Sequence, residues 1–274
     1  MAQEEKSFFE KASPLFIVLS IVLAFFVGTL WQRVRTLEKG KVEGAQQGAT
    51  AAPSQAENAK VSMDTIRGLF DKDVIKFGNK DSKLIFVEIS DTSCPFCHVA
   101  SGENRTIYKD MGRPNFQLVS EGGTYQAPVA EMRKLVDESK ASFVYIYYPG
   151  HGNGEMGAKA LYCAYEKGKF WPVHDLLMSS AGYKFLNETV QNDKSKSGIM
   201  ADFLKSAIDP SFMKECLDSG KYENRLAEDT ALAKSLAPYF GQVFGTPAFF
   251  VNETPFEGAH DWKDMKSVVE AALK

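Results

Sequence analysis

Apolar positions in this chain form short continuous runs that alternate with stretches of helical spacing. Residues 83–90 (KLIFVEIS) are one such run, rich in β-branched and aromatic side chains, which is typical of a buried strand. Residues 142–148 (SFVYIYY) and 247–251 (PAFFV) predict two further strands. Apolar residues recur at helical spacing over about 153–240 and again over 261–273. This order predicts an α/β sandwich with a helical subdomain inserted in its middle.

The N-terminal part of the chain has a different pattern. Residues 15–31 contain no charge, are about long enough to cross a hydrocarbon core and end in Trp31, an aromatic suited to the membrane interface. The stretch that follows is rich in Gly, Ala, Gln and Ser without apolar periodicity, as in flexible tethers. We therefore expect a tail over 1–14, a transmembrane anchor over 15–31, a flexible linker over 32–60 and a folded domain over 61–274. A cleaved signal peptide or a buried helix is the alternative to the anchor.

The composition excludes some classes of function. Of 274 residues, 44% are hydrophobic and 24% are charged, with a formal net charge of -3. These values suit one globular domain with accessory segments, and they provide no basic surface, so nucleic acid is not an expected partner. The glycine-rich stretch GHGNGEMG around His151 lacks the spacing of a phosphate-binding loop. No cofactor is therefore expected.

Two cysteines lie three positions apart in SDTSCPFCH (residues 90–98), directly after the first predicted strand. Such a pair serves as a redox couple, as half of a zinc site or as a structural staple. At the start of a helix, the dipole and the free N–H groups stabilise a thiolate at Cys94, and Pro95 suits the first helical turn. Cys97, one turn deeper, is placed to attack a mixed disulfide on Cys94. Closed zinc sites usually contain two close pairs, so no metal is expected.

Two other positions fit a redox site. Glu88, six residues before Cys94, lies in an apolar strand. It is either exposed on one face or buried with a raised pKa, and in the second case it can exchange a proton with Cys97. Pro247 stands at the entrance of a strand, where proline is tolerated at an edge or in the cis form. A cis Thr246–Pro247 bond would leave the Thr246 backbone free to pair with an extended substrate, whereas the alternative is an ordinary turn proline.

These motifs, in this order, resemble the DsbA-like thiol–disulfide oxidoreductases of the thioredoxin-fold superfamily, of the membrane-anchored bacterial type. The resemblance rests on CPFC after a buried strand and on GTPAFF before a late strand. It also rests on two stretches of the helical section, ALYCAYEKGKFWPVHDLL (160–177) and CLDSG (216–220). It covers most of 75–273, and it implies a thioredoxin fold.

The resemblance also implies roles for individual residues. Cys94 and Cys97 would be the redox couple, Glu88 the buried acid and Pro247 the cis-proline. The residues expected to contact the substrate chain are Thr246, Pro247, Pro95 and Phe96. Some relatives are similar in carrying a second pair, which implies a structural disulfide Cys163–Cys216 that would stabilise the fold by roughly 4 kcal/mol. The alternatives for this pair are two buried free thiols or a zinc site shared by all four cysteines.

The sequence departs from the family pattern at two places. Phe96 stands where the best-known family member has histidine, so a milder oxidant is expected. Residues 104–126 form a longer connection than usual, which we interpret as a surface insertion, with a lid beside the active site as the alternative. Of the histidines near these motifs, His98 is expected on the helix surface, and His174 is expected to be a packed helix residue with a hydrogen bond.

From the resemblance we expect a membrane-tethered enzyme that introduces disulfides into exported proteins through a mixed disulfide at Cys94. Its partners would be exported polypeptides with free thiols and a quinone-linked redox protein of the membrane. This chemistry requires an oxidising compartment, so the domain is expected on the extracytoplasmic side of the cell membrane. Basic residues directly after the anchor argue for the opposite orientation. The alternatives are a reductase or isomerase of the same fold and a non-catalytic membrane-anchored binding module.

Overall fold

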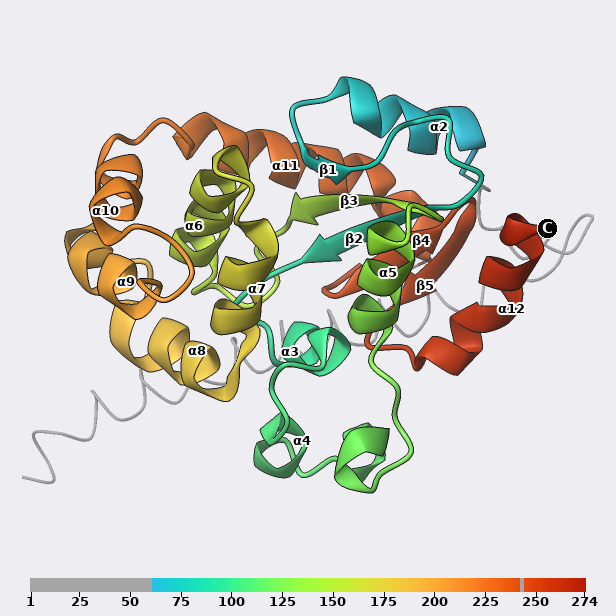
Figure 1. Cartoon of the computed structure of the whole chain (residues 1–274), viewed down its shortest axis with the longest axis horizontal. Coiled ribbons are helices and arrows are strands. Elements are labelled where there is room, and N and C mark those ends of the chain that lie inside the picture. The colour runs from blue at the N-terminus through green and yellow to red at the C-terminus, as the bar shows by residue number, and fades with distance from the viewer. Residues whose placement is uncertain (1–60, 242–243) are drawn as a thin grey trace, which may run out of the picture. The chain divides into compact units, whose positions relative to one another are not determined.

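The computed structural model describes residues 61–241 and 244–274, and a five-stranded mixed sheet lies at the centre of the domain (Figure 1). The strands are β1 (Ile75–Phe77), β2 (Ile85–Ser90), β3 (Ser142–Tyr147), β4 (Ala248–Val251) and β5 (Thr254–Glu257). They lie in the order β1-β3-β2-β4-β5, with β2 parallel to β3 and the other neighbours antiparallel. The strand that precedes the cysteine motif, β2, is therefore the central one.

Helices cover both faces of the sheet, which explains why β2 reads as a continuous apolar run. Side chains of β2 alternate between the faces. Ile85, Val87 and Ile89 pack with α2 (Met63–Gly68) and α11 (Glu223–Leu236). Phe86 points to the opposite face, where the helices are α3 (Pro95–Ser101), α5 (Pro128–Asp137), α6 (Glu155–Glu166), α7 (Phe170–Met178) and α12 (Trp262–Leu273). The second face therefore carries α3, the helix that begins at the cysteine motif.

The helical insert follows β3 and gathers at one end of the sheet (Figure 1). Its members are α6, α7, α8 (Ser180–Lys184), a π-helical turn (Phe185–Val190), α9 (Ser197–Phe203) and α10 (Pro210–Asp218), after which α11 returns along the sheet. The start of α10 shows why the chain turns helical there, since the Asp209 side chain accepts from the Phe212 N–H and Pro210 occupies the first turn. The predicted α/β architecture with inserted helices is confirmed, whereas the short strands β1 and β5 were not predicted.

Within residues 61–241 and 244–274, no helix combines the length and the apolar character that crossing a bilayer requires. The predicted tail over 1–14, the anchor over 15–31 and the linker over 32–60 lie outside the described residues.

Candidate active site

The cysteine motif lies where the chain leaves β2 and enters α3. Cys94 is the N-cap residue of α3, with extended backbone angles (φ -79°, ψ 125°), and Pro95 is the first helical residue. The N–H of Cys97 donates to the Cys94 carbonyl at 3.1 Å. Both thiols are free; Cys94 is 4% exposed, and Cys97 is completely buried. The motif thus leaves Cys94 slightly accessible and shields Cys97 from solvent.

The two thiols differ in how readily they lose a proton. A hydrogen bond from the Cys97 thiol is the main cause that lowers the pKa of Cys94 to about 6, and the N–H groups of Phe96 and Cys97 add to it against the opposing effect of burial. Burial, followed by the hydrogen bond and the charge of Cys94, raises the pKa of Cys97 well above its ordinary value. At neutral pH Cys94 is therefore mainly a thiolate, and Cys97 keeps its proton.

The loop before β4 supplies the other wall of the site. The Thr246–Pro247 peptide bond is cis, and the Cys94 thiol donates to the Thr246 carbonyl at 3.3 Å. Gly150 comes so close to this loop that an added Cβ would lie 2.0 Å from the Thr246 hydroxyl oxygen. The structure therefore brings Thr246 to the nucleophilic sulfur, although the two residues are 152 positions apart.

Glu88 lies on the α3 face of β2 and is completely buried. Burial raises its pKa, and His174 and Ser90 oppose that rise. Its direct neighbour in the sheet is Tyr145 of β3, whose own pKa is raised chiefly by burial and then by the charges of Glu88 and Cys97. The carboxyl and the buried thiol thus lie around the same tyrosine. Of the two alternatives for Glu88, the structure therefore shows the buried carboxyl with a raised pKa and not the exposed one.

His98 contradicts the prediction that it lies on the helix surface. The ring is completely buried, with Nδ1 2.7 Å from the Met178 carbonyl oxygen and Nε2 2.8 Å from the Thr92 carbonyl oxygen. Burial lowers the pKa of His98 to about 4, although both carbonyl contacts oppose this. The prediction was wrong because the insert covers the His98 side of α3, with the Tyr183 ring 4.9 Å away in edge geometry.

The active-site loop, residues 91–94, is held by a second loop that sequence reasoning left without a role. Asp91 is buried, and its Oδ1 accepts from the N–H and the hydroxyl of Ser93, both at 2.8 Å. Its Oδ2 accepts from the His151 N–H at 2.8 Å. A Cβ on Gly154 would lie 1.8 Å from Asp91 Oδ1, so only glycine permits this approach. The glycine-rich stretch GHGNG therefore packs against the active-site loop. In the sequence, the residue that could have indicated this contact is Asp91, an acidic side chain three positions before Cys94.

The 104–126 segment lies against the motif, which its interpretation as a surface insertion did not predict. It contains α4 (Ile107–Asp110), and its Phe116 ring meets the Phe96 ring edge-on at 6.0 Å. Arg113 stacks over Phe96 at 5.4 Å. Both ends of the segment are fastened, because Asn104 Oδ1 accepts from the Ser180 hydroxyl and the Trp262 N–H donates to the Gln126 carbonyl at 2.9 Å. Phe96 is thus half-buried beneath this segment.

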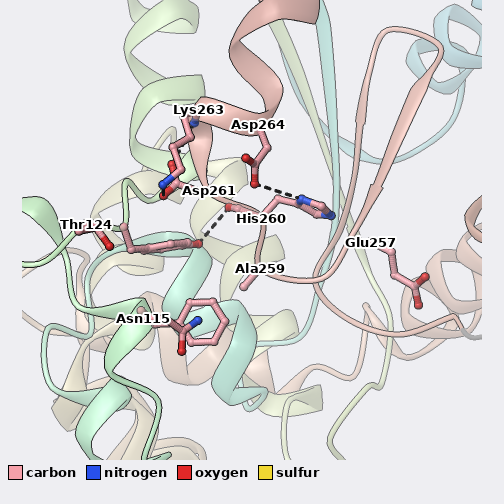
Figure 2. Close-up of a pocket in the computed structure, with 10 residues that line it drawn as sticks. Asn115, Thr124, Glu257, Ala259, His260, Asp261, Lys263 and Asp264 are labelled. Carbon is pink, nitrogen blue, oxygen red and sulfur yellow. Dashed lines mark hydrogen bonds and ion pairs between the residues drawn. The ribbon is translucent and has the colours of Figure 1, made fainter.

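A pocket of about 390 Å³ opens between this segment and the connection from β5 to α12 (Figure 2). Phe116 lines it and also contacts Phe96, so the pocket adjoins the cysteine motif. The β5–α12 side contributes the charged side chains Glu257, His260, Asp261, Lys263 and Asp264. Figure 2 shows Asp264 paired with His260, at 3.5 Å. The pocket therefore has an aromatic wall next to the motif and a charged wall opposite.

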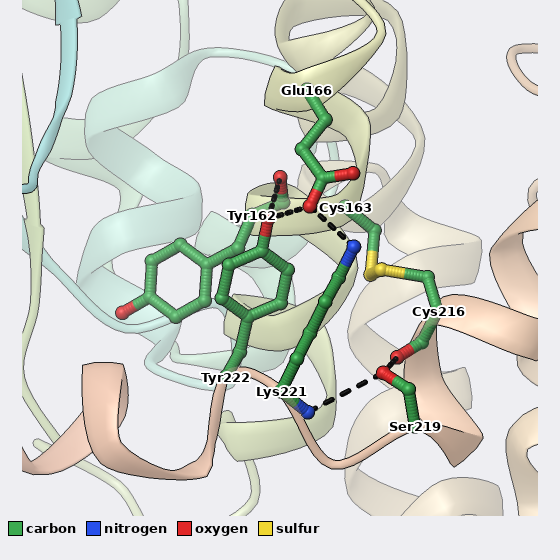
Figure 3. Close-up of a disulfide and its surroundings, with 7 residues drawn as sticks. All are labelled: Tyr162, Cys163, Glu166, Cys216, Ser219, Lys221 and Tyr222. Atoms are coloured by element: carbon green, nitrogen blue, oxygen red, sulfur yellow. Dashed lines mark hydrogen bonds and ion pairs between the residues drawn. A yellow bond between two sulfur atoms is a disulfide. The ribbon is translucent and has the colours of Figure 1, made fainter.

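The second cysteine pair lies in the helical insert. Cys163 of α6 and Cys216 of α10 form a disulfide with Cα atoms 6.1 Å apart (Figure 3). Both are buried in the main apolar core. The bonded sulfurs are not available as thiolate ligands, so the structure excludes the alternatives of two free thiols and of a zinc site shared by all four cysteines. A bridge closing 53 positions stabilises the fold by roughly 4 kcal/mol on the loop-entropy account.

Comparisons with known proteins agree with this fold. The sequence profile of the thioredoxin family matches residues 126–271, more than half of the chain. The chain therefore belongs to the thioredoxin family, and its form is that of a DsbA-like thioredoxin-fold protein, consistent with an oxidoreductase. The matched segment begins after CPFC, so the cysteine site rests on its geometry in the structure.

Individual relatives are distant. Over 206 residues, or 74% of this chain, the identity to the Na(+)/H(+) antiporter NhaA 3 of Salinispora tropica is 24%, and the match spans only 25% of that protein. Over 202 residues, or 72% of this chain, the identity to Disulfide bond formation protein D of Bacillus subtilis is 22%, spanning 76% of that protein. The solved structure of oxidised BdbD from Bacillus subtilis has a TM-score of 0.51 at 20% identity, covering 78% of this chain and 96% of that one.

Proposed function

We propose that this protein is a membrane-tethered thiol–disulfide oxidoreductase that introduces disulfides into exported proteins. The observation that carries the proposal is the contrast between the two thiols of CPFC. Cys94 is slightly accessible, at 4% exposure, with its pKa lowered to about 6, whereas Cys97 is completely buried with a raised pKa. A stabilised thiolate at the outer cysteine favours the reduced pair, and this makes the disulfide form an oxidant.

The proposed reaction has two exchanges. A substrate thiolate attacks Sγ of Cys94 in the Cys94–Cys97 disulfide, and the electron pair of that bond leaves on Cys97, which takes up a proton. A second substrate thiolate then attacks its partner sulfur in the mixed disulfide, and Cys94 leaves as a thiolate. The substrate has lost two electrons and gained a disulfide, and the protein holds both electrons as a dithiol. The lowered pKa of Cys94 makes it the better leaving group in the second exchange.

The substrate chain has a place to bind in this arrangement. The Thr246 carbonyl lies at the Cys94 sulfur, where an extended chain can pair with the backbone of the cis-proline loop. Beside Phe96, the pocket of about 390 Å³ has room for one or two side chains of that chain. Pro95 and Phe96, which are half-buried at the start of α3, form the surface between these two features. Our proposed substrate contacts are therefore Thr246, Pro247, Pro95 and Phe96.

We also propose the cellular setting predicted from the sequence. Residues 15–31 would anchor the protein in the cell membrane, with the domain on the extracytoplasmic side and a quinone-linked membrane protein as reoxidant. The uncharged apolar run supports the anchor, and the need for an oxidising compartment supports the orientation. In intact cells, a cysteine-labelling reagent that does not cross membranes should modify a cysteine-containing tag at the C-terminus of the protein. Labelling only after lysis would place the domain in the cytoplasm.

The reduction potential of the Cys94–Cys97 pair tests the direction of electron flow. The pKa of Cys94, about 6, lies below that of the thioredoxin thiol, about 7, so we expect a potential above the thioredoxin value of about -270 mV. Equilibration with glutathione buffers and trapping of the thiols measures it. A potential at or below that of thioredoxin would instead assign the protein to the reductases.

A further inference from the structure

A group of buried polar atoms lies below the cysteine motif, and the two exchanges described above leave most of it unused. In the described part of the chain, six of these atoms have no hydrogen-bond partner: both carboxyl oxygens of Glu88, the hydroxyls of Ser90, Tyr145 and Tyr147, and Nε2 of His174. They belong to β2, β3 and α7. Buried polar atoms nearly always have partners, which may be ordered waters, so this concentration indicates a polar path through the core.

His174 joins this interior group to the protein surface. The ring is buried with 1% of its side chain exposed, and its Nδ1 lies 3.3 Å from Asp175 Oδ1. Asp175 is 31% exposed and pairs with Arg133 at 2.8 Å. The Phe170 ring stacks on the imidazole at 5.6 Å and fixes its orientation. One nitrogen of His174 is thus directed to a carboxylate that solvent reaches, and the other lies in the interior.

The electrostatics couple the same residues. Burial raises the pKa of Glu88, and the largest opposing effect is that of His174. Burial also opposes ionisation of Asp175, yet His174 and Arg133 outweigh it and lower the pKa of that carboxyl. An ionised Asp175 is an acceptor that can receive a hydrogen bond from Nδ1, 3.3 Å away. Two further titratable groups face His174 from α3 and the residues after it, namely His98 and Glu103.

We propose that His174 relays protons between Glu88 and solvent, so that Cys97 gains and loses its proton without opening the core. The proposal rests on the proposed function, because only a thiol that cycles between bonded and free forms needs such a path. His174 acts through Glu88 and touches neither sulfur nor substrate. Cys97 and Glu88 are both completely buried, which is why a relay is needed.

The transfers balance over one cycle. When a substrate thiolate opens the Cys94–Cys97 bond, the Cys97 thiolate takes the proton of the Glu88 carboxyl. His174 gives the proton on Nε2 to the Glu88 carboxylate and receives one from solvent on Nδ1. The ring then carries its proton on Nδ1, next to Asp175 Oδ1. When the disulfide of the proposed reoxidant accepts the electrons of Cys94 and Cys97, the transfers run in reverse, and the ring returns to its starting tautomer.

The test separates the two cysteines kinetically. The full-length protein in detergent, reduced at Cys94 and Cys97, is mixed with one equivalent of the aromatic disulfide dithiobis(nitrobenzoate). Attack by Cys94 releases one coloured thiolate, and attack by Cys97 on the resulting mixed disulfide releases a second. We expect His174→Gln to leave the first release unchanged and to slow the second about tenfold, below the range of about 100-fold or more that a direct acid or base supplies.

Two comparisons distinguish a relay from a packing role. Glu88→Gln should also slow only the second release, and the double variant should be no slower than the slower single variant, because both residues serve one path. The matched control is His260→Gln, at an imidazole that is 38% exposed, which should change neither release. Wild-type circular dichroism and a normal first release show that His174→Gln is folded. If it is not, Asp175→Asn at the exposed end of the path should slow the second release.

The other possible results contradict either the proton relay or the proposed function. An unchanged second release in folded His174→Gln, or in Asp175→Asn where that variant is needed, removes the relay. The relay is also contradicted if the slowing of the second release in the double variant equals the product of the effects of His174→Gln and Glu88→Gln. If the wild-type protein gives no second release, or if Cys94→Ser still gives the first, the proposed function itself fails. The failure of the relay and the failure of the redox couple are therefore distinguishable.

Discussion

The two cysteine pairs of this chain consist of the same residue type, but one pair is free and the other forms a disulfide. Cys94 and Cys97 share the first turn of one helix and are free, whereas Cys163 and Cys216 come from two helices, 53 positions apart, and are bonded. The first pair lies at the end of the central strand beside the cis-proline loop. The second lies in the main apolar core of the insert. The difference is one of surroundings rather than of the residues themselves.

The comparison shows what makes a thiol pair reactive here. Around Cys94, N–H groups at the start of α3 and the Cys97 thiol stabilise negative charge on sulfur. Around Cys163, the core offers apolar side chains, which favour neutral sulfur. A helix start and a close thiol therefore distinguish the redox site, while burial alone produces an inert link.

The largest effect should come from removing the outer thiol. Cys94→Ser should reduce the rate of thiol oxidation in a model peptide by about a thousandfold or more, because the other free thiol among the described residues, Cys97, is completely buried. At pH 7 the free energy of unfolding of the reduced protein should fall by only about 1.4 kcal/mol, because the stabilised thiolate is lost. Activity comparable to that of the wild type would mean that CPFC is only a structural feature, as in the binding-module alternative.

Removing the second pair should affect stability and spare chemistry. Cys163→Ala with Cys216→Ala should lower the free energy of unfolding by roughly 4 kcal/mol, because the unfolded chain regains the entropy of a closed loop. Urea titration with the Cys94–Cys97 pair kept reduced measures this. Alkylation of Cys94 in the folded variant should keep its wild-type rate. A slower alkylation would show that the disulfide also shapes the redox site.

The glycine-rich loop should matter to the first pair alone. In Gly154→Ala the new Cβ meets Asp91 Oδ1, so the active-site loop must shift, at about 1–3 kcal/mol. We expect slower alkylation of Cys94 at pH 7 as well as a lower unfolding midpoint. The matched control is Gly198→Ala in the insert, where the nearest heavy atom is a flexible Lys214 carbon at 3.8 Å. Equal behaviour of the two variants would show that the close contact is not required.

The smallest effect is a pH dependence of the reduced form. Cys94 has a folded pKa of about 6, below the ordinary value of about 8.5, so its ionisation stabilises the folded reduced protein most above pH 8.5. This contribution is lost as the pH falls through 6. At pH 7 it amounts to about 1.4 kcal/mol relative to Cys94→Ser. Urea titrations of both proteins between pH 5 and 9 measure the difference, and a constant difference would contradict the lowered pKa.

The central strands and the motif were predictable because their signals are local. All six residues of β2 are buried, so the run is apolar except at Glu88 and Ser90, and the cysteine motif follows it directly. The edge strands gave no such signal. β1 has three residues, and β5 alternates half-buried and exposed positions and contains Pro255, a residue that disfavours a strand assignment. Their pairing depends on the strands already present beside them.

The missed parts of the site depend on contacts between distant segments. Asp91 meets His151 across 60 positions, and His98 meets Met178 across 80. A helix of seven residues, such as α3, has too few turns for periodicity to show which side a later insert covers. The same holds for the 104–126 segment, whose contact with Phe96 is invisible in its own composition. Such features become predictable only once the topology is known.

The hydrogen bonds that hold the 104–126 segment at Asn104 and Gln126 have a consequence for which part of the site can vary. The ends of the segment are held by Ser180 and Trp262, and neither fastening passes through the active-site loop. Changes of sequence or length between the two ends should therefore remodel the wall beside Phe96 and leave the sulfur chemistry as it is. The segment would thus shape the proposed substrate contacts beside Phe96 independently of the cysteine pair.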